Sequence, residues 1–297
     1  MTAIALTIAG SDSGGGAGIQ ADLKTFAALG VYGACAVTAV TAQNTEGVRA
    51  IHDVPPEIVA AQIDAVFADL AVGAVKIGML SRRATIEVVA DALARHAARN
   101  VVLDPVMAAS TGARLLAEDA VEALLDLLVP RAWIVTPNLP EAARLAGGMP
   151  ARSEPEMEAQ ARAILARGAR NVLIKGGHGT GAESVDLLVA PDRVLRLAAP
   201  RIATTRTHGS GCTFSSALAA GLAQGRELDA AARAAKDYVT AAIVAADRLQ
   251  VGRGRGPLHH FHTQERAERS APESAQAEQA CGAGPARPDP EATRRNT

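Results

Sequence analysis

Near its start the chain reads Ile4-Ala5-Leu6-Thr7-Ile8-Ala9, then Gly10-Ser11-Asp12-Ser13-Gly14-Gly15-Gly16-Ala17-Gly18, then residues 19–29. The first run is apolar along its length and predicts a buried strand. The glycine-rich segment is typical of a turn, and the spacing of apolar residues from Ala17 to Leu29 predicts a helix. A strand, a glycine turn and a helix in this order predict the first half of a β-α-β unit.

The same alternation continues along the chain. Further strands are expected at Gly33–Thr41, Ala74–Gly78, Val101–Asp104, Trp133–Thr136 and Asn171–Lys175, and helices at Pro56–Leu70, Ala84–Ala98 and Ala117–Leu128. These strands are apolar from end to end rather than alternating, which is typical of a parallel sheet covered on both faces. The chain is therefore predicted to be an α/β protein, with a doubly wound, mostly parallel central sheet and helices on both faces.

Three segments depart from this alternation. Residues 48–54 predict an extra strand off the main sheet, and residues 184–190 and 193–197 predict a hairpin around Pro191-Asp192. From about Thr263 onward Glu, Ala, Ser, Pro and Arg dominate, and such a composition cannot offset its ordering entropy. We therefore expect one domain at residues 1–262 and a disordered tail at residues 263–297.

Composition restricts the class of protein. The 297 residues are 48% hydrophobic and carry 30 Lys and Arg against 31 Asp and Glu. The near-zero net charge argues against nucleic acid or a membrane surface as partner, and 2% aromatic residues argue against base stacking. Cys35, Cys212 and Cys281 are odd in number and far apart, so no disulfide framework is expected. With neither a leader nor a spanning segment predicted, the expected compartment is the cytoplasm.

The segment Thr207-His208-Gly209-Ser210-Gly211-Cys212-Thr213 predicts an anion site. It leads into a stretch with helical spacing, so it is expected at a helix N-terminus, where unpaired N–H groups and the helix dipole suit phosphate oxygens. Gly209 and Gly211 permit close approach of the backbone to an anion. Cys212 lies where the pKa of a thiol is expected to fall, and we favour a functional role over a small core residue. An anion hole beside a proton acceptor is what phosphoryl transfer to an alcohol requires.

Polar residues also follow several of the predicted strands. Asp104 follows one strand, Asn138 and Glu141 follow the next, and Lys175 ends another. Because ligands of doubly wound sheets bind at the carboxyl ends of strands, these residues are expected to converge on magnesium and nucleotide phosphates. Each has a simpler interpretation, Asp104 as a turn residue and Asn138 with Glu141 as a helix capping box. The glycines of residues 10–18 fit a dinucleotide fingerprint only loosely, and Gln43-Asn44 replaces the acidic residue that NAD binding requires.

Taken together, these motifs resemble the hydroxymethylpyrimidine/phosphomethylpyrimidine kinases of thiamine biosynthesis, in the ribokinase-like superfamily. The resemblance covers about Ile4 to Phe261. It is carried by residues 9–13, 18–25, 38–45, 76–80, 104–107, 136–141, 175–178, 208–213 and 254–258, in the order of the family. The pattern departs from the family at Gly14 and Ser210, where serine and threonine are usual.

This resemblance implies a ribokinase-like three-layer sandwich and successive phosphorylation of an aminopyrimidine alcohol and its monophosphate by ATP with Mg²⁺. Cys212 is implied as the base, and Gly209 and Gly211 as the anion hole. The remaining implied roles are ATP binding by Lys175, Asn138 and Glu141, magnesium binding by Asp104 and Glu141 through water, and substrate binding by Gln43, Gly10, Asp22 and Met79. A homodimer is also implied.

Two other functions remain open at this point. A pyridoxal or pyridoxine kinase would act on a similar hydroxymethyl group, and a ligand sensor would use the fold without catalysis. Gln43 favours the aminopyrimidine, because a carboxamide offers one donor and one acceptor to a ring nitrogen and its exocyclic amine.

Overall fold

The computed structural model describes residues 1–108, 112, 115–179 and 181–263. Residues Met1–His260 form one compact unit, and Phe261–Thr297 are assigned to a second. The predicted tail therefore lies, from residue 264 onward, outside the described residues. The candidate site belongs to the first unit.

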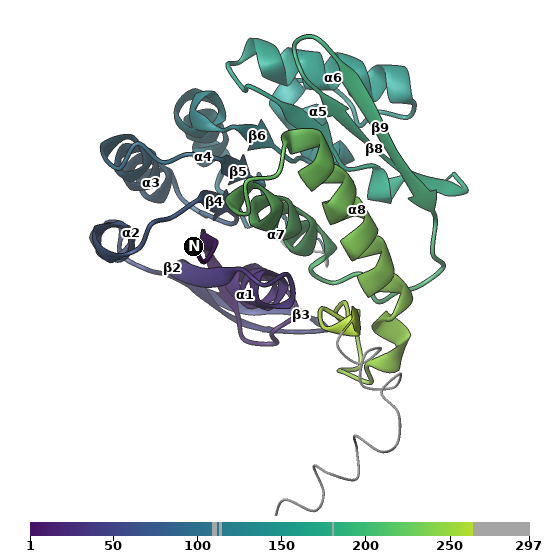
Figure 1. The fold of residues 1–297 in the computed structure, drawn as a ribbon, viewed down its shortest axis with the longest axis horizontal. Coiled ribbons are helices and arrows are strands. Elements are labelled where there is room, and N and C mark those ends of the chain that lie inside the picture. The colour runs from purple at the N-terminus through teal and green to yellow at the C-terminus, as the bar shows by residue number, and fades with distance from the viewer. Residues whose placement is uncertain (109–111, 113–114, 180, 264–297) are drawn as a thin grey trace, which may run out of the picture. The chain divides into compact units, whose positions relative to one another are not determined.

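A single mixed sheet runs through this unit, with strand order β3-β2-β1-β4-β5-β6-β7-β8-β9 (Figure 1). The pairs from β2 to β7 are parallel, and β3, β8 and β9 pair antiparallel at the two edges. The strand bounds are β1 Ile4–Asp12, β2 Tyr32–Asn44, β3 Gly47–Asp53, β4 Ala74–Ile77, β5 Val101–Leu103, β6 Ile134–Val135, β7 Val172–Ile174, β8 Glu183–Val189 and β9 Val194–Pro200. The predicted doubly wound, mostly parallel sheet is confirmed.

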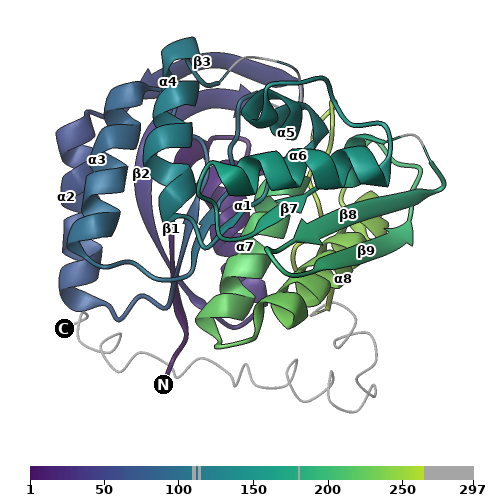
Figure 2. The same ribbon diagram turned by 90° about the horizontal axis from the view of Figure 1, so that it is seen from above.

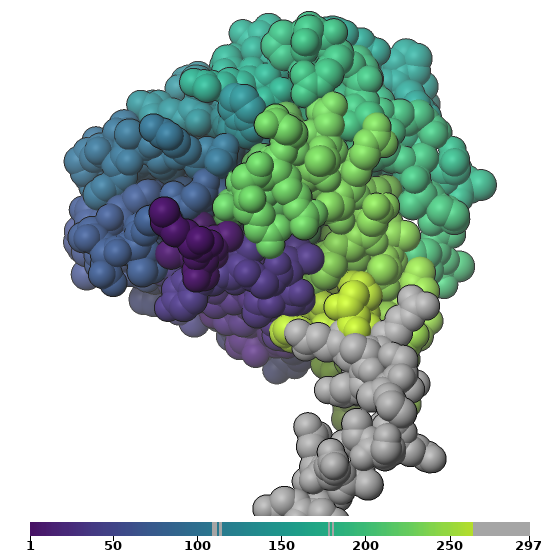
Figure 3. All heavy atoms as spheres, viewed as in Figure 1, coloured from purple at the N-terminus to yellow at the C-terminus, as the bar shows by residue number. Residues whose placement is uncertain are grey.

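Helices cover both faces of the sheet (Figure 2). One face packs against α1 (Gly18–Ala28), α7 (Ser210–Ala223) and α8 (Leu228–Val244) around one apolar core. Helix α7 contacts both α1 and α8. The other face packs against α2 (Pro56–Asp69), α3 (Arg83–Arg95), α4 (Glu118–Ala123), α5 (Leu139–Ala146) and α6 (Glu154–Ala166), around a second core. In the space-filling view, the green surface of α7 and α8 adjoins the purple surface of the N-terminal elements (Figure 3).

The segment at residues 48–54 differs from the expectation. It is a strand, as predicted, but it does not lie off the main sheet. The chain turns back after β2, with Asn44 Oδ1 accepting hydrogen bonds from the N–H groups of Glu46 (2.9 Å) and Gly47 (3.2 Å). Residues 47–53 then pair antiparallel with the end of β2 and form the edge of the same sheet.

The hairpin predicted around Pro191-Asp192 is confirmed as β8 and β9. Its first strand pairs antiparallel with β7 and so extends the central sheet. Helices α6 and α8 were not predicted from the sequence. Among the described residues, none of the helices combines the length and apolar character needed to cross a bilayer.

The parallel topology brings one end of each central strand to a common edge. Asp12 ends β1, Met79 follows β4, Asp104 follows β5, and Asn138 and Lys175 follow β6 and β7. The N-terminus of α7 lies at the same edge, because His208 N–H donates to the Gly256 carbonyl and His208 lies against Asp12. This edge holds the candidate active site.

Candidate active site

A cleft of about 1580 Å³ lies at the carboxyl ends of the central strands and at the start of α7. Nearly all the predicted site residues line it. They are Gly10, Gln43, Met79, Asp104, Asn138, Glu141, Lys175, Gly209, Gly211 and Cys212. The convergence expected from the parallel topology is therefore present, and Asp22 is the exception among them.

The turn that opens α7 has the geometry of an anion site. Gly209 is the residue before the first helical residue and has φ 82°, the left-handed region that favours glycine. A Cβ at Gly209 would lie 1.9 Å from the Gly16 carbonyl oxygen, so the two glycine turns are in close contact. The N–H groups of Gly211 and Cys212 lie in the first turn of α7, where no intrahelical acceptor is available to them. This end of the helix is suited to oxyanions.

A cation and a carboxylate lie beside this turn. Lys175 Nζ contacts Asp104 Oδ1 at 2.6 Å, and a Cβ at Gly211 would lie 3.3 Å from the same ammonium. Ser215 Oγ donates to Asp104 Oδ2 at 3.1 Å. Burial would lower the pKa of Lys175, but Asp104 and Glu141 outweigh it and the pKa is raised. A charged lysine therefore faces the entrance of α7.

Asn138 and Glu141 form the capping box that was the simpler interpretation of their spacing. Asn138 Oδ1 accepts from the Glu141 N–H at 3.0 Å, and Glu141 Oε2 accepts from the Asn138 N–H at 2.8 Å. Both side chains also line the cleft, so the cap does not exclude a role with a ligand. Burial raises the pKa of Glu141 to about 7, against the lowering effect of Lys175, and Asp104 raises it further.

These carboxylates are the groups available to a divalent cation. Among the described residues, none forms a group of three or more His, Cys, Asp and Glu side chains arranged to hold a metal. Mg²⁺ commonly takes one or two carboxylates and completes its shell with waters and substrate phosphates. The crowding of Asp104 and Glu141 around a single Lys175 fits such a shared site.

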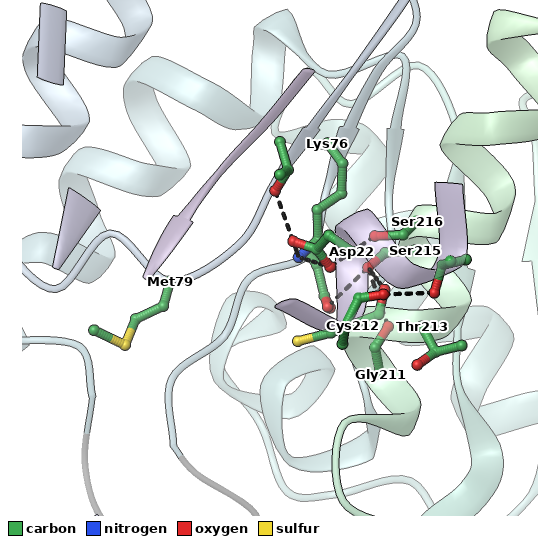
Figure 4. Close-up of polar contacts among 12 residues, drawn as sticks. Asp22, Lys76, Met79, Gly211, Cys212, Thr213, Ser215 and Ser216 are labelled. Atoms are coloured by element: carbon green, nitrogen blue, oxygen red, sulfur yellow. Dashed lines mark hydrogen bonds and ion pairs between the residues drawn. The ribbon is translucent and has the colours of Figure 1, made fainter. Parts of the chain in front are cut away.

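Asp22 lies beneath the cleft rather than in its wall. Its side chain is fully buried, and both carboxylate oxygens contact Lys76 Nζ, at 2.9 and 2.8 Å. Thr7 and Ser216 hydroxyls donate to the same carboxylate at 2.6 and 2.7 Å (Figure 4). The structure thus places Asp22 in a buried ion pair, where a direct contact with substrate is not available to it.

Lys76 had no role assigned from the sequence, although it lines the cleft. A signal was present, because a lysine in the apolar strand Ala74–Ile77 of a doubly covered sheet must be buried and needs a carboxylate partner.

Cys212 differs from the expectation in its ionisation. It lies in the first turn of α7 and lines the cleft, as predicted. Burial, however, raises the pKa of its thiol to about 11, although the Lys76 ammonium and the Gly18 N–H lower it. Asp22 and Asp104 raise it further. The expected lowering by the helix N-terminus is therefore outweighed by burial and by two nearby carboxylates.

The residues predicted to bind the substrate ring also line the cleft. Gln43 Oε1 accepts from Thr41 Oγ1 at 3.1 Å, and its Nε2 lies 3.4 Å from His208 Nε2. A Cβ at Gly10 would lie 3.3 Å from Met79 Cε, so these two residues are adjacent. Gln43 thus presents a polar group to the cleft, and Gly10 and Met79 present an adjacent apolar surface.

Asp12 and His208 connect the two glycine turns and were assigned no definite role from the sequence. Asp12 accepts from the N–H groups of Gly14 (2.8 Å), Gly16 (3.1 Å) and Ala17 (2.9 Å). Its Oδ2 also lies 3.0 Å from His208 Nε2. An aspartate followed by glycines is a sequence signal for such a turn.

Known proteins resemble this chain in both sequence and fold. A family model described as phosphomethylpyrimidine kinase matches residues 12–259. A Rhizobium meliloti (strain 1021) protein named hydroxymethylpyrimidine/phosphomethylpyrimidine kinase is 62% identical over 262 residues, 88% of this chain and 98% of the relative. Among solved structures, an ADP complex of Bacillus subtilis pyridoxal kinase is 37% identical with a TM-score of 0.82, over 89% of this chain and 100% of that one. Staphylococcus aureus pyridoxal kinase in complex with AMP-PCP and pyridoxal is 33% identical with a TM-score of 0.81, over 89% and 95%.

Proposed function

The chain belongs to the phosphomethylpyrimidine kinase family, and on this premise we propose that it phosphorylates 4-amino-5-hydroxymethyl-2-methylpyrimidine and then its monophosphate. ATP is the donor, and the pathway is thiamine biosynthesis. The main support is a relative 62% identical whose name joins the two kinase activities. The site supports it independently, because an anion turn, a lysine and a thiol meet at one end of α7.

The structural observation that best supports the proposal is the position of Gly211 between Lys175 and Cys212. A Cβ on Gly211 would lie 3.3 Å from the Lys175 ammonium, and the next residue along the helix bears the thiol. A phosphoryl group held by the N–H groups of this turn would therefore meet a cation and a proton acceptor together. Phosphoryl transfer depends mainly on such positioning and charge neutralisation.

In the proposed first step, the γ-phosphoryl group of ATP is transferred to the hydroxymethyl oxygen of the substrate. The hydroxymethyl oxygen forms a bond to the γ-phosphorus, and the bond from that phosphorus to the bridging oxygen of ADP breaks. ADP leaves with the bonding electron pair. The Cys212 thiol first loses its own proton to solvent, and the hydroxyl proton of the substrate then passes to the resulting Cys212 thiolate. In the second step the acceptor is a phosphate oxygen, which is largely ionised at neutral pH and needs no base.

Mg²⁺ is proposed at Asp104 and Glu141, bound in part through water. When bound, it neutralises phosphate charge and orients the transferring group. Asn138 holds Glu141 in place through the capping box, and Lys175 adds a second positive charge beside the same phosphates. Gln43, Gly10 and Met79 are proposed to bind the pyrimidine ring, with Gln43 reading its polar edge.

A pyridoxal kinase is the second candidate, because solved structures named so are 33–37% identical to this chain. The higher identity to the pyrimidine kinase favours the first candidate. The deciding experiment incubates the full chain with ATP and MgCl₂ plus either aminopyrimidine or pyridoxal, and separates the products chromatographically.

We expect the aminopyrimidine to give first a monophosphate and then a diphosphate, with ADP released at each step. Formation of pyridoxal phosphate alone would favour the second candidate. Binding of the aminopyrimidine without ADP release would instead indicate a ligand sensor. Omission of MgCl₂ should abolish both phosphorylations if the metal assignment is correct.

We also propose that the protein forms a homodimer and lies in the cytoplasm. The edge strand β3 is largely exposed, and Val40 and Ile51 on β2 and β3 are exposed apolar residues at 50% and 40%. Exposed apolar residues on an edge strand favour contact with a second chain. The free thiols Cys35 and Cys212 suit a reducing compartment. Sedimentation of wild type and of Ile51→Lys tests the dimer, since the variant should sediment as a monomer.

A further inference from the structure

The Asp22–Lys76 pair is a complete ionic cluster buried under the cleft floor. Lys76 comes from β4 and Asp22 from α1, and both side chains are 0% exposed. Thr7 and Ser216 hydroxyls satisfy the carboxylate from β1 and α7. Burial would lower the pKa of Lys76, but Asp22 outweighs it and the pKa is raised, so the lysine is charged. An ion pair without solvent screening acts strongly on any titratable neighbour.

The spacing of α7 places Cys212 directly over this pair. Residues four apart lie one above the other on the same face of a helix, so Cys212 shares its face with Ser216. Ser216 Oγ donates to Asp22 Oδ1 at 2.7 Å, which fixes the direction of that face toward Asp22. Figure 4 shows Cys212, Ser216, Asp22 and Lys76 gathered at this point.

The Lys76 ammonium lies beside a glycine and close to the cleft. A Cβ at Gly78, just after β4, would lie 2.8 Å from Lys76 Nζ. Lys76 lines the cleft even though Asp22 does not. The Lys76 ammonium has three N–H donors. Among the described residues, its hydrogen bonds go to the two carboxylate oxygens of Asp22. The third N–H can therefore point toward the cleft.

The charged groups around Cys212 come from four elements. Lys76 on β4 and Asp22 on α1 lie beneath it, while Asp104 after β5 and Lys175 after β7 lie beside it. Asp104 and Lys175 contact each other at 2.6 Å and face the adjacent row of α7, through Ser215. The pair under the thiol is therefore Asp22–Lys76.

We propose that Lys76 and Asp22 are positioning residues that set the proton affinity of the Cys212 sulfur in opposite directions. The Lys76 ammonium favours the thiolate, and the Asp22 carboxylate favours the thiol. Together they leave the thiol protonated at rest, with a cation beneath it that stabilises the thiolate once the thiol has lost its proton. The catalytic part of this inference rests on the proposed role of Cys212, but the effect on the sulfur does not.

The test measures the ionisation of Cys212 directly. Alkylation by iodoacetamide is followed from pH 6 to pH 10.5 by mass spectrometry of the peptide that contains Cys212, since the thiolate is the reactive form. A midpoint above this range is obtained from the alkylation rates measured below it, because there the rate is proportional to the thiolate fraction. Asp22→Asn is compared with Asp22→Asn/Lys76→Met, so that these two proteins differ only in the ammonium. The matched control is Asp186→Asn/Lys236→Met, which removes another buried lysine–aspartate pair, with Lys236 Nζ 2.9 Å from Asp186.

We expect Asp22→Asn to lower the alkylation midpoint and Lys76→Met to raise it again. Below the midpoint, the rate at a fixed pH should change about tenfold when the midpoint moves by one on the pH scale. The control pair should leave the midpoint unchanged. Equal midpoints for Asp22→Asn and the double variant would overturn the inference. If Asp22→Asn alone does not fold, the double variant must react more slowly than wild type at pH 9, because Lys76 lines the cleft together with Cys212 and Asp22 does not.

Failure of this inference is distinguishable from failure of the proposed function. Should Cys212→Ala keep full activity while the alkylation midpoints shift, the base assignment is wrong and the charge effect stands. Should Cys212→Ala be inactive while the midpoints coincide, the base assignment stands and Lys76 has no part in it. A structural role alone would lower activity in the double variant without moving either the midpoint or the pH profile of kcat.

Discussion

Ser215 and Ser216 are consecutive residues of α7, yet their hydroxyls bind different carboxylates. Ser215 Oγ donates to Asp104 at 3.1 Å, and Ser216 Oγ donates to Asp22 at 2.7 Å. Because consecutive helical residues point in directions about 100° apart, α7 separates two lysine–carboxylate pairs. One pair, Lys175–Asp104, faces the anion turn, and the other, Lys76–Asp22, lies beneath the thiol. In the proposed function, the Lys175–Asp104 pair would meet the phosphates and the Lys76–Asp22 pair would lie under the proton acceptor.

Replacement of the thiol should separate the two proposed phosphorylations. Cys212→Ala removes the base for the alcohol, and loss of a general base commonly costs about 10²- to 10⁴-fold in rate. The second transfer has an ionised phosphate oxygen as acceptor, so its kcat should fall much less. The KM for ATP should stay nearly constant in both steps. Single-turnover rates with the alcohol and with the monophosphate measure the difference.

The matched control for this prediction is Cys35→Ala, because Cys35 is a free thiol within β2 and away from the cleft. Its two rates should equal those of wild type. An equal loss in both steps for Cys212→Ala would show that the thiol positions the phosphates rather than accepting a proton, and full retention of both rates would remove it from the reaction.

Gly209 should not tolerate a side chain. Its φ of 82° costs an alanine about 1–2 kcal/mol, and its Cβ would also meet the Gly16 carbonyl at 1.9 Å. Gly209→Ala should therefore destabilise the fold by more than the conformational cost and displace the anion turn. Gly30→Ala is the control, because Gly30 has φ 72° with open space around it and should show the conformational cost alone. Urea unfolding compares the two, and equal losses would mean that the contact between the glycine turns relaxes freely.

Most of the fold follows from local sequence patterns. The central strands are short apolar runs that end where polar residues begin, so their order and burial could be predicted. The edge strand at residues 47–53 was misplaced, because its pairing with β2 depends on a turn at Asn44 and not on its own composition. Helix α8 went unpredicted, since its buried face is largely alanine, including Ala231, Ala235 and Ala242, and gives little contrast with its exposed face.

Part of the candidate site could also be predicted from the sequence, and part could not. Asp104, Asn138 and Lys175 follow parallel strands, so their convergence is a consequence of topology. The Lys76–Asp22 pair joins residues 54 positions apart, and it depends on how α1 packs on the sheet, which no local pattern reports. The pKa of Cys212 was misjudged for a related reason: the helix N-terminus is visible in sequence, whereas the burial and the carboxylates that oppose it are not.

Asp12 should make stability depend on pH in the acid range. Burial would raise its pKa, but hydrogen bonds from His208 and from the N–H groups of Gly14 and Ala17 lower it overall. The folded pKa is therefore below the unfolded value of about 4, and the carboxylate contributes fully above that value. As the pH falls from about 4 toward the folded pKa, the unfolded chain binds the proton first and this contribution is lost. Urea unfolding of wild type and Asp12→Asn should show a constant gap from pH 7 to 5 that narrows toward pH 3, and a gap that stays constant throughout would contradict the prediction.

Gln43 should determine affinity for the pyrimidine without affecting ATP. Its carboxamide lies in the cleft between Thr41 and His208, and in the proposed function it pairs with the polar edge of the ring. Gln43→Leu keeps the approximate side-chain volume but leaves the polar ring atoms of the bound pyrimidine without their partner. This loss costs about 1–3 kcal/mol, or roughly a 5- to 150-fold rise in the KM for the pyrimidine. The KM for ATP should change little, because the residues proposed to bind ATP are Lys175, Asn138 and Glu141 rather than Gln43. Gln224→Leu is the matched control, since its amide donates to the Leu29 carbonyl outside the cleft and both KM values should stay at their wild-type levels. Initial rates at varied pyrimidine and fixed saturating ATP measure the effect, and an unchanged pyrimidine KM would mean that the ring binds elsewhere.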